Sequence, residues 1–146
     1  MTKAVKVARY FLSLADEEAG DVISNLKLQK LLYYAQGFHL ALFKKPLFDD
    51  EIRAWTHGPV VPSTYHVYKD FGAAAIPIPD DIDPNEITDE ERGLLDEVYN
   101  VYGQYSAWKL RNMTHTERPW VDAYNLGPDT VISDESMTEF FRHLTN

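Results

Sequence analysis

The sequence contains no cysteine and few basic residues. Without cysteine the chain has no disulfides, thiolate metal ligands or cysteine nucleophiles, and it fits a reducing compartment, so we expect a cytoplasmic protein. Lysine and arginine number 14 against 23 acidic residues, which gives a net charge of −9. Such a chain repels phosphate backbones unless its bases cluster, and here they are dispersed. We therefore expect no direct binding to nucleic acid.

Long apolar runs are also absent. No window approaches the roughly 18 consecutive apolar residues typical of a membrane helix. Lys6 and Arg9 interrupt the apolar pattern near the N-terminus, which does not resemble a signal peptide. With 146 residues, of which 45% are hydrophobic and 13% aromatic, the chain can build a real core. We expect one domain, residues 1–146, with no membrane contact.

The sequence lacks the nucleophile motif G-x-S-x-G, the phosphate loop G-x-x-x-x-G-K-[ST] and the dinucleotide motif G-x-G-x-x-G. Five histidines are present, of which His39 is expected to be a hydrogen-bonded core residue. His115 and Glu117 form an H-x-E pair that matches no zinc signature. Together with His57 they would be the residues of a small metal-dependent hydrolase, a less favoured alternative. We expect no metal, no cofactor and no catalytic residues.

The strongest local pattern predicts a central helix over residues 24–43. Ser24 is suited to be its N-cap, and apolar residues cover about half of the cylinder. The opposite face carries Gln29 and Gln36 but also Tyr33 and Leu40. Aromatic and apolar anchors framed by polar groups are typical of protein interfaces. This stripe is therefore either a partner surface or a face covered by another part of the domain.

The rest of the chain predicts a mainly α protein with a small β-ribbon near residues 46–56. The ribbon has Asp49-Asp50 as its turn and ends before Gly58-Pro59, and residues 73–87 are expected to be irregular. Gly20 is the expected C-cap of the first helix. The expected helix starts are Thr2, Pro62, Thr88 (with Glu91 as a capping box), Ser106, Pro119 and Ser133.

Three segments of the chain carry specific motifs. The first is K-L-Q-K-L-x-Y-x-x-Q-G over residues 27–37, and the second is P-L-F-x-D-x-I-x-A-W-x-x-G-P-V-x-P-x-x-Y over residues 46–65. The third is T-H-x-E-x-P-W over residues 114–120. In combination they resemble the Panacea domain, also called SocA-like or GepA-like, which is found in prophages and small bacterial operons. Arg53 departs from the family pattern, because members often carry Glu there.

This resemblance implies a mostly helical fold with a small β element and an antitoxin role of the type II-like kind. It implies a cognate toxin, encoded in the same operon and neutralised by direct protein–protein binding. A proteolytic adaptor that delivers the toxin to a protease is an alternative, whereas the charge disfavours a transcriptional regulator. The oligomeric state stays open. We expect the partner-binding residues to be Gln29, Tyr33, Gln36, Leu40, Arg53 and His57.

Overall fold

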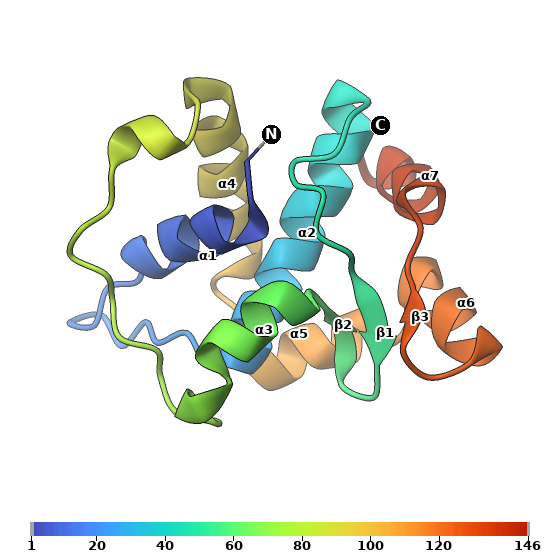
Figure 1. Ribbon diagram of the computed structural model, residues 1–146, viewed down its shortest axis with the longest axis horizontal. Coiled ribbons are helices and arrows are strands. Elements are labelled where there is room, and N and C mark those ends of the chain that lie inside the picture. The colour runs from blue at the N-terminus through green and yellow to red at the C-terminus, as the bar shows by residue number, and fades with distance from the viewer. Residues whose placement is uncertain (1, 146) are drawn as a thin grey trace.

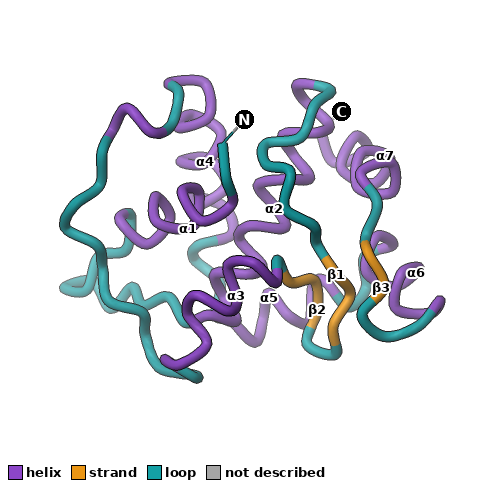
Figure 2. The backbone as a smooth tube through the Cα atoms, in the orientation of Figure 1, coloured by secondary structure: helices purple, strands orange, loops and turns teal. Residues whose placement is uncertain are grey.

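Helices dominate the computed structural model, which describes residues 2–145 (Figures 1 and 2). The predicted fold class, mainly α with a small ribbon, is confirmed. The helices are α1 (Ala4–Ser13), α2 (Asn25–Phe43), α3 (Pro62–Tyr68), α4 (Asp89–Tyr102), α5 (Ala107–Thr114), α6 (Arg118–Leu126) and α7 (Asp134–Thr145), with 3₁₀ turns at Lys69–Phe71 and Pro84–Glu86. The strands are β1 (Arg53–Trp55), β2 (Gly58–Val60) and β3 (Thr130–Val131).

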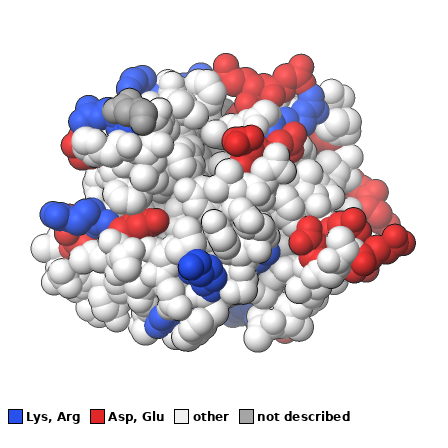
Figure 3. All heavy atoms as spheres, turned by 180° about the vertical axis from the view of Figure 1, so that it is seen from behind, with Lys and Arg blue, Asp and Glu red and all other residues white. Residues whose placement is uncertain are grey.

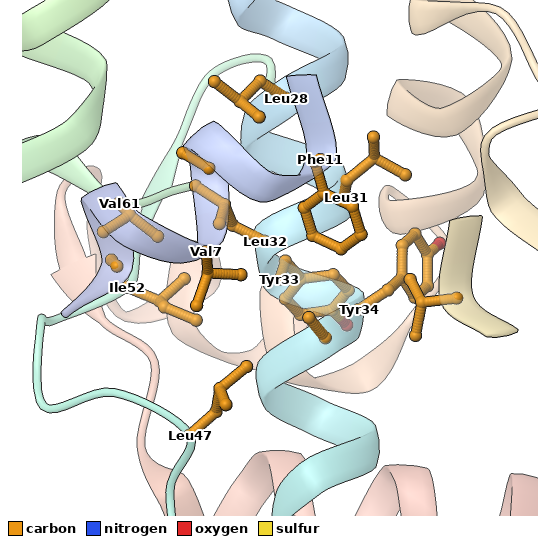
Figure 4. Packing of buried hydrophobic residues seen from close by; sticks show 14 of the residues in the cluster. Val7, Phe11, Leu28, Leu31, Leu32, Tyr33, Tyr34, Leu47, Ile52 and Val61 are labelled. Atoms are coloured by element: carbon orange, nitrogen blue, oxygen red, sulfur yellow. The ribbon is translucent and has the colours of Figure 1, made fainter. Parts of the chain in front are cut away.

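Helix α2 is the centre of the molecule, as its pattern predicts. Fifteen of its 19 residues are buried, and it contacts α1, α3, α4, α5, α7 and β2. Figure 4 shows Val7 and Phe11 of α1 packed against the leucines of α2. The side chain of Ser24 accepts a hydrogen bond from the backbone N–H of Lys27, so the expected N-cap is confirmed. Burial extends well beyond the half-cylinder that the apolar residues cover, and the polar face is enclosed as well.

Helix α7 packs tightly on α2. Gly37 faces the ring of Phe141, and a Cβ atom at position 37 would overlap that ring. Phe141 also packs edge-to-face on Tyr33 and Phe38, with ring centroids 5.4 and 4.9 Å apart. Glycine at position 37 therefore lets an aromatic ring lie directly on the backbone of the central helix.

The ribbon lies later in the chain than predicted. β1 pairs antiparallel with β2 and with β3, so the turn falls at Thr56-His57, and Gly58-Pro59 belong to a strand. The predicted turn at Asp49-Asp50 is wrong. The preceding segment is tied to α2 instead, and Asp50 accepts hydrogen bonds from the N–H of Ala4 (3.1 Å) and the hydroxyl of Ser63 (2.6 Å). Asp50 thus joins the starts of α1 and α3.

Two predicted ends of the first helix are also wrong. Thr2 is not the N-cap: its hydroxyl donates to the carboxylate of Glu91 at 2.9 Å. The helix ends at Ser13, well before Gly20. The other predicted starts are confirmed, at Pro62, Ser106, Pro119 and Ser133 and at the Thr88–Glu91 capping box. The confirmed helix starts are those at which a capping side chain or a proline affects residues next to it in the sequence.

We expect Gly37→Ala to lower the free energy of unfolding by about 1–3 kcal/mol, because the new methyl group overpacks the α2–α7 contact. Gly93→Ala is the matched control, since Gly93 lies on the exposed side of α4 with no atom near the added Cβ. This control should be neutral or stabilise the protein by up to about 1 kcal/mol through helix propensity. Urea unfolding of both variants measures the difference. Equal stability of the two would show that α7 does not pack on Gly37.

Candidate partner-binding site

Four of the six predicted partner residues lie in the core. Gln29, Tyr33, Gln36 and Leu40 are each at most 4% exposed. The expectation that they form a solvent-facing stripe is therefore wrong, and the alternative, a face covered by other parts of the domain, is correct. Arg53 and His57 do reach the surface, at the ribbon. Their contact with a partner stays a prediction.

The two buried glutamines hold connecting segments against α2. Gln29 Oε1 accepts from the N–H of Val61 at 2.9 Å and from the hydroxyl of Thr64 at 3.3 Å. Gln36 Oε1 accepts from the N–H of Leu47 at 2.7 Å, and its Nε2 donates to the carbonyl of Phe48 at 2.7 Å. A buried amide must find such partners, because leaving it unpaired costs about 1–3 kcal/mol. These residues build the fold.

Tyr33 has a structural partner in the third motif. The hydroxyls of Tyr33 and Tyr34 each donate to one carboxylate oxygen of Glu117, both at 3.0 Å. Burial raises the pKa of Glu117 to about 7, and the two tyrosine hydrogen bonds only partly oppose this shift. Both oxygens of Glu117 are therefore occupied inside the protein.

The other members of the hydrolase hypothesis are also engaged structurally. His115 stacks on Trp120 with ring centroids 4.0 Å apart, and its pKa is lowered, first by burial and then by the charge of Arg111. Its Nε2 is buried and has no hydrogen-bond partner in the part of the chain that the structure describes. Within residues 2–145, no three histidine, aspartate or glutamate side chains are placed to hold a metal ion. The geometry gives the hydrolase alternative no support.

Lys30 joins all three motifs at one point behind the ribbon. It is fully buried, and its ammonium group donates to the carbonyl of Pro59 at 3.0 Å. Burial, and secondarily the charge of Arg111, lower the pKa of Lys30 to about 7. Gly58 has φ +109°, and a Cβ there would lie 2.6 Å from Lys30 Cε and 2.8 Å from Thr114 Oγ1. Only glycine lets the ribbon approach α2 and α5 this closely.

The surface beside this point carries three large side chains, His57, Trp108 and Arg111, which we call the aromatic–basic surface. The guanidinium carbon of Arg111 lies 4.4 Å from the ring centroid of Trp108, a cation–π contact. Arg111 Nε also donates to His57 Nδ1 at 3.3 Å. Trp108 is 57% exposed despite its size. Two residues of this surface come from α5 and one from the ribbon turn.

His57 is one of the predicted partner residues, whereas Trp108 and Arg111, which lie beside it in the structure, are not among them. Their spacing of three residues after the Ser106 cap places both on one side of α5, so a helical projection of residues 107–114 would have grouped them. Arg53 forms its contacts with other residues than these. Its guanidinium donates to the carboxylate of Glu51 at 3.0 Å and to the carbonyl of Asp129 at 2.9 Å. These bonds fasten β1 to the turn that precedes β3.

We expect the stability of the protein to fall as pH rises from about 4.5 to about 7, in part through Glu117. Its pKa is higher in the folded than in the unfolded chain, so the folded state keeps a proton that the unfolded state has lost. The raised pKa of Glu117 contributes its full stabilisation, at most about 3 kcal/mol, below about pH 4.5. This contribution is lost as the pH rises through about 7. Glu117→Gln removes this contribution, whereas Glu97→Gln on the exposed side of α4 is the control. Urea unfolding across this pH range should give a flatter profile for Glu117→Gln alone. A slope identical to wild type would contradict the raised pKa.

The part of the chain that the structure describes has no helix long and apolar enough to cross a membrane. No solved structure matches the chain. Antitoxin SocA of Caulobacter vibrioides (strain NA1000 / CB15N) is 35% identical over 120 residues, which cover 74% of this chain and 63% of that protein. This chain therefore spans less than two thirds of that relative's length. The family described as "Antitoxin SocA-like, Panacea domain" matches residues 28–121, which include most of the central helix, the strands β1 and β2 and the Glu117 carboxylate. The chain belongs to the antitoxin SocA-like, Panacea domain family.

Proposed function

We propose that this protein is an antitoxin that neutralises a cognate toxin by binding it directly through the aromatic–basic surface. Membership of the family and the likeness to a protein named Antitoxin SocA support the antitoxin role. The observation that carries the direct-binding part is the half-exposed Trp108 under the guanidinium of Arg111. The toxin is a protein encoded in the same operon, and binding takes place in the cytoplasm.

Trp108 and Arg111 have the character of interface anchors. Tryptophan and arginine are enriched among the few residues that dominate binding energy in protein complexes. The stacked arrangement already holds the arginine side chain in one position, so less conformational entropy is lost when a partner covers it. A helix or loop of the toxin that packs on this surface would remove the large apolar ring of Trp108 from water.

The helix that presents these side chains is held firmly in place. The side chain of Ser106 caps α5, and Leu110 and Thr114 are buried on its inner face. The neighbouring His57 is fixed by the hydrogen bond from Arg111, at a two-residue turn between paired strands. Binding groups mounted on rigid elements keep their geometry without further ordering, which favours tight association.

We expect Trp108→Ala combined with Arg111→Ala to weaken toxin binding by at least about 100-fold, since truncation of one hot-spot residue costs about 2 kcal/mol or more. Growth of cells that co-express the neighbouring toxin should no longer be rescued. Trp108 is exposed and Arg111 is half-buried, and they contact each other and the exposed His57, so the free energy of unfolding should stay within about 1 kcal/mol of wild type. Binding is measured by calorimetry with the purified toxin.

Leu144→Ala is the matched control, because Leu144 is 49% exposed and belongs to the last turn of α7. Figure 1 shows the C-terminal end of the chain at the top and the ribbon turn at the bottom. It should rescue growth as wild type does. The amount of toxin in rescued cells separates two mechanisms. A constant amount supports direct inhibition, whereas loss of the toxin that depends on a protease would establish the adaptor alternative. Full rescue by the folded double variant would place the interface elsewhere.

A further inference from the structure

A cavity of about 500 Å³ lies beside the aromatic–basic surface, and we call it the hairpin cavity. It lies where the start of α2, the ribbon turn and α3 meet, and its apolar walls are formed by Leu26, Trp55, Val60 and Tyr65. Its volume is in the range of pockets that enclose a small ligand or a few side chains. His57 belongs both to this cavity and to the aromatic–basic surface, so the two are continuous.

The charged lining of the hairpin cavity is mostly basic, although the protein carries a net charge of −9. Its basic residues are Lys69, which is exposed, and Lys30, which is fully buried behind the wall, and Asp129 is the single acid among the lining residues. Asp129 is already engaged: its carboxylate accepts from Trp55 Nε1 at 2.9 Å and lies 3.5 Å from the guanidinium of Arg53. Figure 3 shows the rear face of the molecule, where acidic side chains gather at the top and along the right-hand edge, whereas basic side chains are scattered over the upper left, the left and the lower part.

Three hydrogen-bond donors at this cavity could donate to a bound ligand. His57 Nδ1 accepts from Arg111, so its ring proton lies on Nε2. Lys69 is exposed and Tyr65 is half-buried at the wall of the cavity, so the ammonium and hydroxyl groups of these two residues are accessible to a ligand. Lys30, behind them, has a carbonyl partner but forms no ion pair within the same range. A buried cation without a nearby anion is destabilised, and an anion placed in the cavity would offset this cost.

We propose that the hairpin cavity receives a carboxylate side chain of the protein partner, carried next to an apolar side chain that packs on Trp55 and Tyr65. This proposal rests on the proposed function and names the chemistry of the toxin surface: an acidic residue beside an apolar or aromatic anchor. The His57 Nε2–H, the Lys69 ammonium and the Tyr65 hydroxyl donate to the carboxylate. The charge of the bound carboxylate would raise the pKa of Lys30 and so oppose the lowering that burial causes.

The cavity can be tested without a toxin, using phenylacetate and its neutral analogue phenylacetamide as probes. Both present the same ring, and only phenylacetate carries the charge. The full chain is titrated with each probe while the indole N–H signal of Trp55 is followed by NMR, with Trp55→Phe identifying that signal. We expect phenylacetate to bind about tenfold more tightly than the amide, the effect of one charge-assisted hydrogen bond. His57→Phe with Lys69→Met should abolish this preference, and Lys45→Met, a lysine at the far end of α2, should keep it.

Equal binding of the two probes, or no shift of Trp55 with phenylacetate, would overturn the carboxylate site and leave growth rescue by the wild-type protein unaffected. A preference for phenylacetate that survives in His57→Phe/Lys69→Met would equally overturn it. A second double variant, Tyr65→Phe with Lys69→Met, leaves the aromatic–basic surface intact and is used to capture the co-expressed toxin. Capture at the wild-type level would show that the cavity is not part of the interface, whereas reduced capture by a folded variant supports the proposal. Failure of the Trp108–Arg111 interface would leave the probe result standing, so the two proposals fail separately.

Discussion

The burial of the polar side of α2 is the constraint on which the rest of this structure depends. A helix enclosed on nearly all sides must find partners for each of its polar side chains, because an unpaired buried group costs more than a hydrogen bond gains. Gln29, Lys30 and Gln36 find theirs in backbone groups of the segments that follow. Lys27 does the same at the other side, where its ammonium donates to the carbonyl of Gly103 at 2.6 Å. The central helix therefore positions the ribbon, the start of α3 and the end of α4 through its own polar residues.

This constraint explains why sequence reasoning described the helices well and the surface poorly. Caps at Ser24, Thr88 and Ser106 are local, since a side chain bonds to a backbone group three residues away, and such patterns are visible in one sequence. Whether Gln29 or Gln36 faces water is decided by residues far along the chain. Hydrophobic periodicity depends only on which residues are polar, so it cannot distinguish an amide side chain in water from one that is hydrogen-bonded to the backbone of a loop. For the same reason the ribbon was predicted too early in the chain. The backbone groups of Leu47 and Phe48 bond to the side chain of Gln36 and not to a neighbouring strand. The strand β3, which pairs with β1, is only two residues long.

The candidate site could be predicted only in part, for a related reason. His57 could be proposed from the sequence because it stands in a motif between a tryptophan and a Gly-Pro pair. Trp108 lies outside the three motifs, and a tryptophan in a short amphipathic helix is more often buried than exposed. Its exposure follows from the orientation of α5, which Leu110 and Thr114 fix from the inside. Arg111 then gains its role from the distance to Trp108 and His57, which only the folded chain establishes.

Under the proposed function, folding and partner recognition depend on different residues of the same small domain. Lys30, Gly58 and Glu117 bring the three motifs together inside the protein, and their substitution disturbs buried contacts. Trp108 and Lys69 lie on the outer side of elements whose positions those contacts determine. Surface substitutions away from buried networks usually change stability by less than about 0.5 kcal/mol, whereas a single interface anchor can change affinity by several. A fold built this way can exchange the side chains around the ribbon turn, and with them its partner, while α2 continues to hold the same loops. Specificity for one toxin would then depend on the apolar ring at α5 and the basic cavity beside it, a pairing in which an acidic partner is selected by a protein that is itself acidic overall.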